Sequence, residues 1–281
     1  MSEPKTYPII LAHGIARFDF LSDLLLRIDN DDSDDGLHYF RNIRTHLMAH
    51  NFVVYHSHVS WAADVEARAD DLKAGVERIL HETGAEKVHI IAHSMGGLDA
   101  RHMLYKNRDQ QLHKKIASLT TIGTPHHGSA VADYVTGAVD LERVLVRAAA
   151  QLGLGAGIAG FWNLTTESRA AFNRKVESWE GNCGVRFRTY AGAQMRQKIF
   201  EPLRPFSDKI DGPNDGLVPV ESARWKDEYF VGPVLDADHL NLIGWVDLSE
   251  LPDYLSFFGM EARIKKLYLD IARELAQVFT L

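Results

Sequence analysis

One serine lies in a sequence context that suits a nucleophile. Ser94 follows the largely apolar run 88–93, and Gly96 and Gly97 come directly after it at the start of a predicted helix. A sharp strand-to-helix turn holds a serine in a strained backbone conformation, and the residues two before and two after it must then be small. Ala92 and Gly96 meet that requirement. The pattern predicts a nucleophile elbow in preference to a serine that only caps a helix.

Six short motifs occur in the same order as in a known family. They are PIILAHG at 8–14, AHSMGG at 92–97, GTPHHGS at 123–129, NLTTE at 163–167, NDGLV at 214–218 and DHL at 238–240. Together they make the chain resemble the bacterial true lipases of the α/β-hydrolase superfamily. Ala92 departs from this pattern, because the usual first residue of the elbow motif is glycine. The resemblance implies the α/β-hydrolase fold and a Ser–His–Asp catalytic triad.

A serine hydroxyl becomes a good nucleophile only when a base takes its proton and a carboxylate orients that base. The superfamily orders these residues as serine, acid, histidine along the chain, which favours His239 among the 14 histidines. The family's motifs favour Asp215 as the acid, although an aspartate before glycine also stabilises its own turn. Four other carboxylates compete for this role, namely Asp208, Asp211, Asp236 and Asp238.

Two backbone N–H groups are expected to form an oxyanion hole. One belongs to Met95, the residue after the nucleophile. The resemblance assigns the other to Ile15, which follows His13-Gly14.

A structural calcium ion occurs in many lipases of this family. The resemblance matches its ligands to Glu201 and Asn241, and asparagine stands here where the family has aspartate. Asn241 could still coordinate an ion through its amide oxygen. We expect no cofactor to be required for bond breaking.

The elements that must position these residues alternate between strand-like and helical patterns. Strands are predicted at 7–12, 52–59, 87–92, 116–122, 185–191 and 229–234, and helices at 64–83, after Ser94 through Met103, and near the C-terminus. Strands that alternate with helices predict a mostly parallel central sheet flanked by helices on both faces. Because no linker or repeat divides the chain, we expect a single domain over 1–281.

The segment 130–175 interrupts the alternation of strands and helices. Leu141, Val144, Leu145, Ala148 and Leu152 fall on one helical face, and several glycines follow them. Most apolar stripes of this kind belong to a core. The place of the insertion favours a helical cap or lid that covers the site and touches acyl chains.

Composition limits the classes of partner. The formal charge is −7 with no basic stripe, which disfavours nucleic acid. Cys183 is the only cysteine, so no intrachain disulfide forms. No apolar window reaches the ~18 residues that a transmembrane segment needs. The N-terminus does not resemble a signal peptide, so we expect a cytoplasmic protein, with signal-independent export as the alternative.

The sequence therefore predicts a serine ester hydrolase, a lipase or carboxylesterase, that acts on acylglycerols or medium-to-long acyl esters. The cap adds an expected transient contact with a lipid–water interface. An acyltransferase, thioesterase or lactonase would use the same triad, and these alternatives stay open. A catalytically inactive binding module is the third reading, against which the intact Ser94, Asp215 and His239 argue.

Overall fold

The computed structural model describes residues 6–14, 35–36, 38–60, 63–137, 162–246 and 254–277, with only the backbone for 254–258. The strands are β1 (Ile9–Ala12), β2 (Val54–His56), β3 (Val88–His93), β4 (Ile116–Ile122), β5 (Arg186–Tyr190), β6 (Gly192–Ala193) and β7 (Leu235–Asp236). The helices are α2 (Ile43–Met48), α3 (Val65–Thr83), α4 (Met95–Lys106), α5 (Ala130–Gly137), α8 (Thr166–Glu180), α9 (Arg204–Ser207), α10 (Val220–Arg224) and α11 (Tyr254–Gln277). Short 3₁₀ turns, η1 to η4, cover Leu112–Lys115, Arg196–Lys198, Glu201–Leu203 and Asn241–Ile243.

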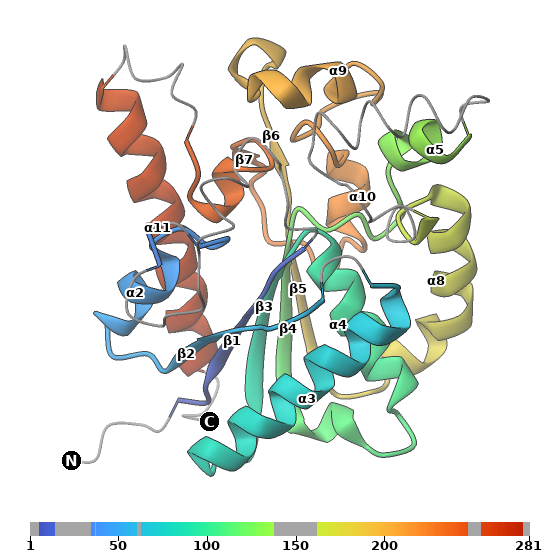
Figure 1. The fold of residues 1–281 in the computed structure, drawn as a ribbon, viewed down its shortest axis with the longest axis vertical. Helices are drawn as coiled ribbons and strands as arrows, with labels where there is room; N and C mark the ends of the chain where they lie inside the picture. Colours follow the sequence, from blue (N-terminus) through green and yellow to red (C-terminus); the bar gives the residue numbers. More distant parts are fainter. Residues whose placement is uncertain are drawn as a thin grey trace.

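The centre of the molecule is a five-stranded parallel sheet in the order β2-β1-β3-β4-β5. β3 is fully buried along its length and pairs on both sides, with β1 and β4. Continuous apolar runs such as those in β1 and β3 are typical of strands covered on both faces. The predicted parallel sheet is therefore confirmed (Figure 1).

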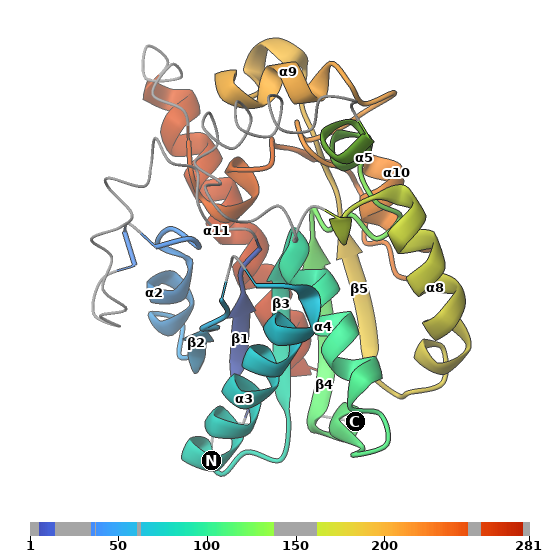
Figure 2. The same ribbon diagram turned by 45° about the vertical axis from the view of Figure 1, so that its right-hand side comes forward.

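Alternate residues of the central strands face two separate layers of helices. Ile9 and Ile91 pack in one apolar cluster with residues of α2 and α11. Ile10 and Ile90 pack in the other cluster with residues of α3 and α4. This two-residue alternation follows from the pleat of a strand, and the two helix layers lie on opposite sides of the sheet (Figure 2).

The predicted strand at 229–234 is wrong. In this segment Thr189 and Phe230 form only an isolated bridge, and the short β7 begins at Leu235 and pairs with β6. Pro233 provides the physical reason, because proline has no N–H to donate to a sheet and interrupts a run of strand residues.

Helix α8 is fastened to α4 by a buried ion pair. Arg101 donates to both carboxylate oxygens of Glu180, at 2.8 and 2.9 Å, and the two side chains are 1% and 2% exposed. The Arg101 guanidinium also donates to Asn173 Oδ1 at 2.8 Å and lies 4.0 Å from the centre of the Trp225 ring. The pair therefore joins two helices and the segment that carries Trp225.

We expect Arg101→Met to lower the free energy of unfolding by about 3–5 kcal/mol, because it leaves the Glu180 carboxylate buried without its partner. Chemical denaturation measures this loss. Arg78→Met is the matched control, since it breaks the Arg78–Glu82 pair, which is about half exposed, and should cost at most ~1 kcal/mol. Equal stability of the two variants would contradict the assignment.

Candidate active site

Ser94 occupies the sharp turn between β3 and α4. Its φ is 54° and its ψ −132°, a conformation that costs an L-residue about 1–3 kcal/mol. A Cβ atom at Gly96 would lie 2.5 Å from the carbonyl oxygen of Ala12, so only glycine fits there. The Thr124 hydroxyl donates to the Ser94 carbonyl at 2.8 Å and holds the turn. The backbone thus has the geometry that a nucleophile elbow requires.

His239 and Asp215 form a buried hydrogen-bonded pair. The His239 Nδ1 and Asp215 Oδ2 atoms are 2.8 Å apart, and the side chains are 4% and 1% exposed. The other carboxylate oxygen of Asp215 accepts the N–H groups of Leu217 at 3.0 Å and Val218 at 2.7 Å. With its carboxylate held in this way, Asp215 can accept the Nδ1 proton of His239 and leave Nε2 free to accept another.

Three of the four competing carboxylates have other contacts, and the fourth faces solvent. Asp208 binds Arg196 at 2.5 Å, and Asp236 lies 4.0 Å from Lys198 and Arg263. Asp211 is exposed. Asp238 is buried and accepts backbone N–H groups. Among these five carboxylates, hydrogen bonding to the His239 ring is recorded for Asp215 alone.

The segments that carry Ser94, Asp215 and His239 lie close together at the carboxyl edge of the sheet. The rings of His93 and His239 are 4.4 Å apart between centroids, and Ser94 follows His93 in the chain. A Cβ atom at Gly123, where φ is +57°, would lie 3.1 Å from Asp215 Oδ2 and 3.5 Å from His93 Nε2. The loops that carry Asp215 and His239 therefore pack directly on the ends of β3 and β4.

Of the two expected oxyanion donors, only Met95 lies within the described residues. Met95 is the first residue of α4, where an N–H group has no partner within the helix. Ile15 lies outside the described residues. Its neighbour Gly14 is described, and a Cβ atom there would lie only 2.8 Å from Ser94 Cβ. The loop that leads to Ile15 thus starts beside the nucleophile.

Sequence reasoning missed the contacts that join the family's motifs. Ser129 donates its hydroxyl to the Leu217 carbonyl at 2.6 Å and its N–H to the Leu164 carbonyl at 3.0 Å. It also missed Tyr39, whose hydroxyl lies 2.8 Å from Nδ1 of His93. Such pairs join residues far apart in the chain, and no local pattern marks them. The order of the motifs indicates only that they belong together.

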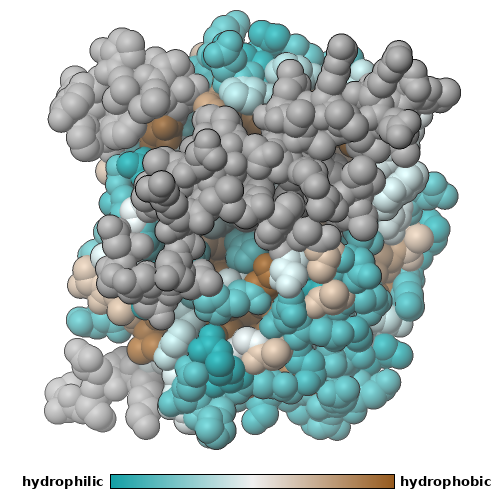
Figure 3. Space-filling view, in the orientation of Figure 1, coloured by the Kyte–Doolittle hydropathy of each residue, from teal (hydrophilic) through white to brown (hydrophobic). Residues whose placement is uncertain are grey.

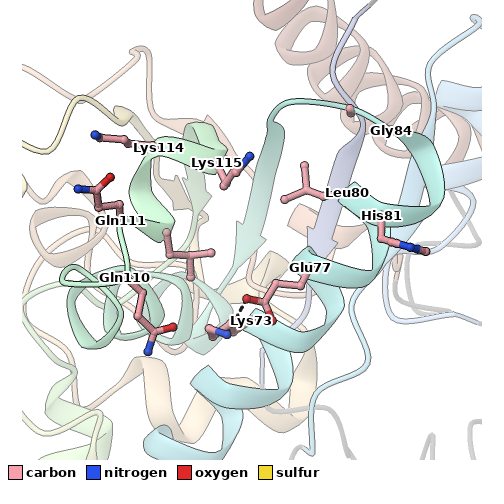
Figure 4. Close-up of a pocket in the computed structure, with 11 residues that line it drawn as sticks. Lys73, Glu77, Leu80, His81, Gly84, Gln110, Gln111, Lys114 and Lys115 are labelled. Atoms are coloured by element: carbon pink, nitrogen blue, oxygen red, sulfur yellow. Dashed lines mark hydrogen bonds and ion pairs between the residues drawn. The ribbon is translucent and has the colours of Figure 1, made fainter.

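A pocket with a volume of about 670 Å³ lies elsewhere in the described part of the chain. Its lining includes Lys73 and Glu77 of α3, Gly84, and the η1 segment (Figure 4). Gly84 and η1 precede the starts of β3 and β4. Because Ser94 follows the opposite end of β3, this pocket is separate from the candidate active site.

The described residues do not fit the calcium ion that the resemblance implies. Asn241 is 2% exposed, its Oδ1 accepts the N–H of Asp238 at 3.1 Å, and its Nδ2 donates to the Trp245 carbonyl at 2.9 Å. Glu201 is exposed. Within the described ranges, no cluster of three or more His, Cys, Asp or Glu side chains has a geometry that could hold a metal.

Asp238 connects two loops through its carboxylate. Its carboxylate accepts the N–H groups of Phe200 at 2.8 Å, Leu240 at 3.0 Å and Asn241 at 2.8 Å. This ties the His239 loop to the segment before η3.

The predicted cap is described only at its two ends. Its start is α5, and its end includes the first part of α8, while residues 138–161 lie outside the described part of the chain. The lid itself stays a prediction.

Most described residues on the face shown in Figure 3 are hydrophilic, with some hydrophobic residues near the middle of the view. Within the described ranges, no helix has both the length and the apolar composition that crossing a bilayer requires.

Comparison with known proteins identifies the family of this chain. The family profile described as the alpha/beta hydrolase fold matches residues 7–209. The chain is 30% identical to triacylglycerol lipase 2 of Saccharomyces cerevisiae, covering 98% of this chain and 93% of that protein. It is 33% identical to a triacylglycerol lipase of Vibrio cholerae, covering 75% and 72%.

Solved structures share the fold at lower identity. A Staphylococcus hyicus lipase superposes with a TM-score of 0.68 at 18% identity, covering 99% of this chain and 97% of that one. A metagenomic carboxyl esterase superposes with a TM-score of 0.70 at 20% identity, covering 99% and 77%. The chain therefore belongs to the α/β-hydrolase family, which confirms the predicted fold class and the resemblance to its lipases. Within that family it belongs to the carboxylic ester hydrolases.

We expect EDTA to leave the thermal unfolding midpoint within about 1 °C of its original value, because the Asn241 oxygen is already hydrogen-bonded. Differential scanning fluorimetry with EDTA and then with excess Ca²⁺ measures this. A midpoint that falls by several degrees in EDTA and recovers with calcium would contradict this expectation.

Asp238→Asn should destabilise the protein by about 1–3 kcal/mol, since one buried N–H loses its acceptor. Asp236→Asn, at an exposed neighbour, is the control.

Proposed function

We propose that the protein hydrolyses carboxylic esters with Ser94 as nucleophile, His239 as general base and acid, and Asp215 as the residue that orients His239. The observation that carries this proposal is the buried 2.8 Å hydrogen bond between His239 and Asp215. The His239 ring packs on the His93 ring, and His93 is followed in the chain by Ser94, which has the elbow conformation.

The proposed reaction has two halves. In the first, His239 Nε2 takes the Ser94 proton while Oγ bonds to the ester carbonyl carbon, and the N–H groups of Met95 and Ile15 stabilise the oxyanion. His239 then protonates the leaving alcohol as the ester C–O bond breaks. In the second, His239 takes a proton from water, which attacks the acyl-enzyme. His239 returns this proton to Ser94 Oγ as the acid leaves.

We further propose medium-to-long acyl esters, including acylglycerols, as substrates. Triacylglycerol lipases are named among the relatives of this chain. Met95, beside the nucleophile, packs in an apolar cluster with Leu98, Ala132 and Leu164. Trp162 and Tyr134, at the described ends of the predicted cap, are 50% and 44% exposed. Apolar side chains at these positions would be available for contact with acyl chains. The cap, the cytoplasmic location and independence of a cofactor stay predictions.

We expect Ser94→Ala to abolish labelling by a fluorophosphonate probe and to lower kcat for p-nitrophenyl esters by about 10⁴-fold or more. Asp215→Asn should lower kcat roughly 10³- to 10⁴-fold, because the imidazole loses the partner that fixes its tautomer. His239→Ala should behave like Ser94→Ala.

Two variants serve as matched controls for this experiment. Ser222→Ala removes another buried serine hydroxyl, and His102→Ala removes a histidine 2.6 Å from the Glu66 carboxylate. Both should keep labelling. A wild-type protein that is not labelled, or a Ser94→Ala variant that is, would contradict the proposed nucleophile.

We expect the wild type to hydrolyse p-nitrophenyl octanoate faster than the acetate, with kcat/KM as the measure. Burial of each additional CH₂ group contributes about 0.8 kcal/mol at most, so the ratio should rise up to several-fold per group. Trp162→Ala should reduce this ratio, whereas Met48→Ala, at an exposed apolar residue of α2, should leave it unchanged. A steep fall in rate above butyrate would contradict the substrate class.

A further inference from the structure

Two residues outside the proposed triad link its parts. His93 is completely buried at the end of β3, and its ring lies against that of His239 with 4.4 Å between centroids and 48° between planes. The Tyr39 hydroxyl lies 2.8 Å from His93 Nδ1. Tyr39 precedes α2, so a residue about 200 positions before His239 reaches the ring on which it packs.

The Tyr39 hydroxyl is placed to donate its proton to His93. Burial raises the pKa of the Tyr39 hydroxyl, and the Gly14 backbone lies beside its oxygen, since a Cβ atom at Gly14 would lie 3.0 Å from it. A protonated hydroxyl can donate to His93 Nδ1, 2.8 Å away. The remaining imidazole proton of His93 then lies on Nε2, which has no well-formed hydrogen bond. The main chain of His239 lies near this ring.

His93 favours the neutral form in this environment. Burial and the proximity of the His239 imidazole hold the pKa of the His93 imidazole well below its usual range. A neutral neighbour suits a catalytic histidine that must itself become positively charged during the reaction, because a second positive charge at 4–5 Å would oppose that step.

We propose that Tyr39 and His93 are positioning residues that hold the His239 ring in register with Ser94 and with the Gly14 loop. This inference rests on the proposed function of Ser94 and His239. The chain of contacts runs from the Gly14 backbone to the Tyr39 hydroxyl, from Tyr39 to His93, and from the His93 ring to the His239 ring. His93 also precedes Ser94 in the chain, so its ring couples the base to the nucleophile.

The chain contains a closely matched control for the loss of the Tyr39 hydroxyl. His89, four residues before His93 on the same strand, has the Ser118 hydroxyl 2.7 Å from its Nδ1. Both pairs are hydroxyl–imidazole hydrogen bonds that involve β3; Tyr39 is partly buried, and Ser118 is 1% exposed. Of the two pairs, only the Tyr39–His93 pair lies at the end of β3 that Ser94 follows.

The test compares Tyr39→Phe with Ser118→Ala in steady-state hydrolysis of a p-nitrophenyl ester and in the rate of Ser94 labelling by a fluorophosphonate. Tyr39→Phe should lower kcat about 10- to 100-fold with KM within about two-fold of wild type, because misplacement of a catalytic group affects the chemical step. The labelling rate should fall in parallel. Ser118→Ala should keep both rates within about two-fold.

His93 provides the second pair of variants. His93→Asn keeps an acceptor close to the position of Nδ1, whereas His93→Leu removes it, so the asparagine variant should retain at least three-fold more activity. This pair also decides the matter if Tyr39→Phe does not fold, which circular dichroism would show.

The possible failures are distinguishable. If Ser94→Ala remains as active as wild type, the proposed function is wrong. If Ser94→Ala is inactive while Tyr39→Phe matches Ser118→Ala and the two His93 variants match each other, the function stands and the positioning inference is wrong.

Discussion

The strained turn at Ser94 depends on close contact between three neighbouring strands. Its backbone N–H donates to Ile122 at the end of β4, and its carbonyl accepts from Thr124 just beyond that strand. On the other side, Gly96 packs against the carbonyl oxygen of Ala12 at the end of β1. A strained conformation persists only where the surrounding structure fixes it from several sides. The central position of β3 in the sheet provides these contacts.

The acid and base of the proposed triad depend on a different kind of support. Asp215 and His239 lie in loops whose backbone N–H groups are satisfied by nearby side chains. Asp215 accepts from Leu217 and Val218, while Asp238 accepts from Leu240, Asn241 and Phe200. Buried polar groups are stable only when they are paired in this way. The pairing joins the His239 loop to Phe200 and holds the Asp215 carboxylate in its own turn.

Much of the fold could be predicted because local patterns carry it. The apolar runs of β1, β3 and β4 and the spacing of α3 predicted these elements within a few residues. The helix α3 begins after Asp64, whose carboxylate accepts the Ala67 N–H, and ends at Gly84 with a φ of 65°. The strand predicted at 229–234 is wrong, because Pro233 interrupts the apolar run in this segment.

By itself the sequence determined the elbow, because the small residues around Ser94 and the buried strand before it are local requirements of one turn. It also narrowed the acid to a few aspartates and ordered the motifs along the chain. Only the tertiary structure decided which carboxylate bonds His239, and only it brought Tyr39 to His93. The physical reason is that these hydrogen bonds join residues far apart in the chain. Asp215 and His239 are separated by 24 positions, and Tyr39 and His93 by 54. Such pairing depends on the packing of loops and helices around the sheet.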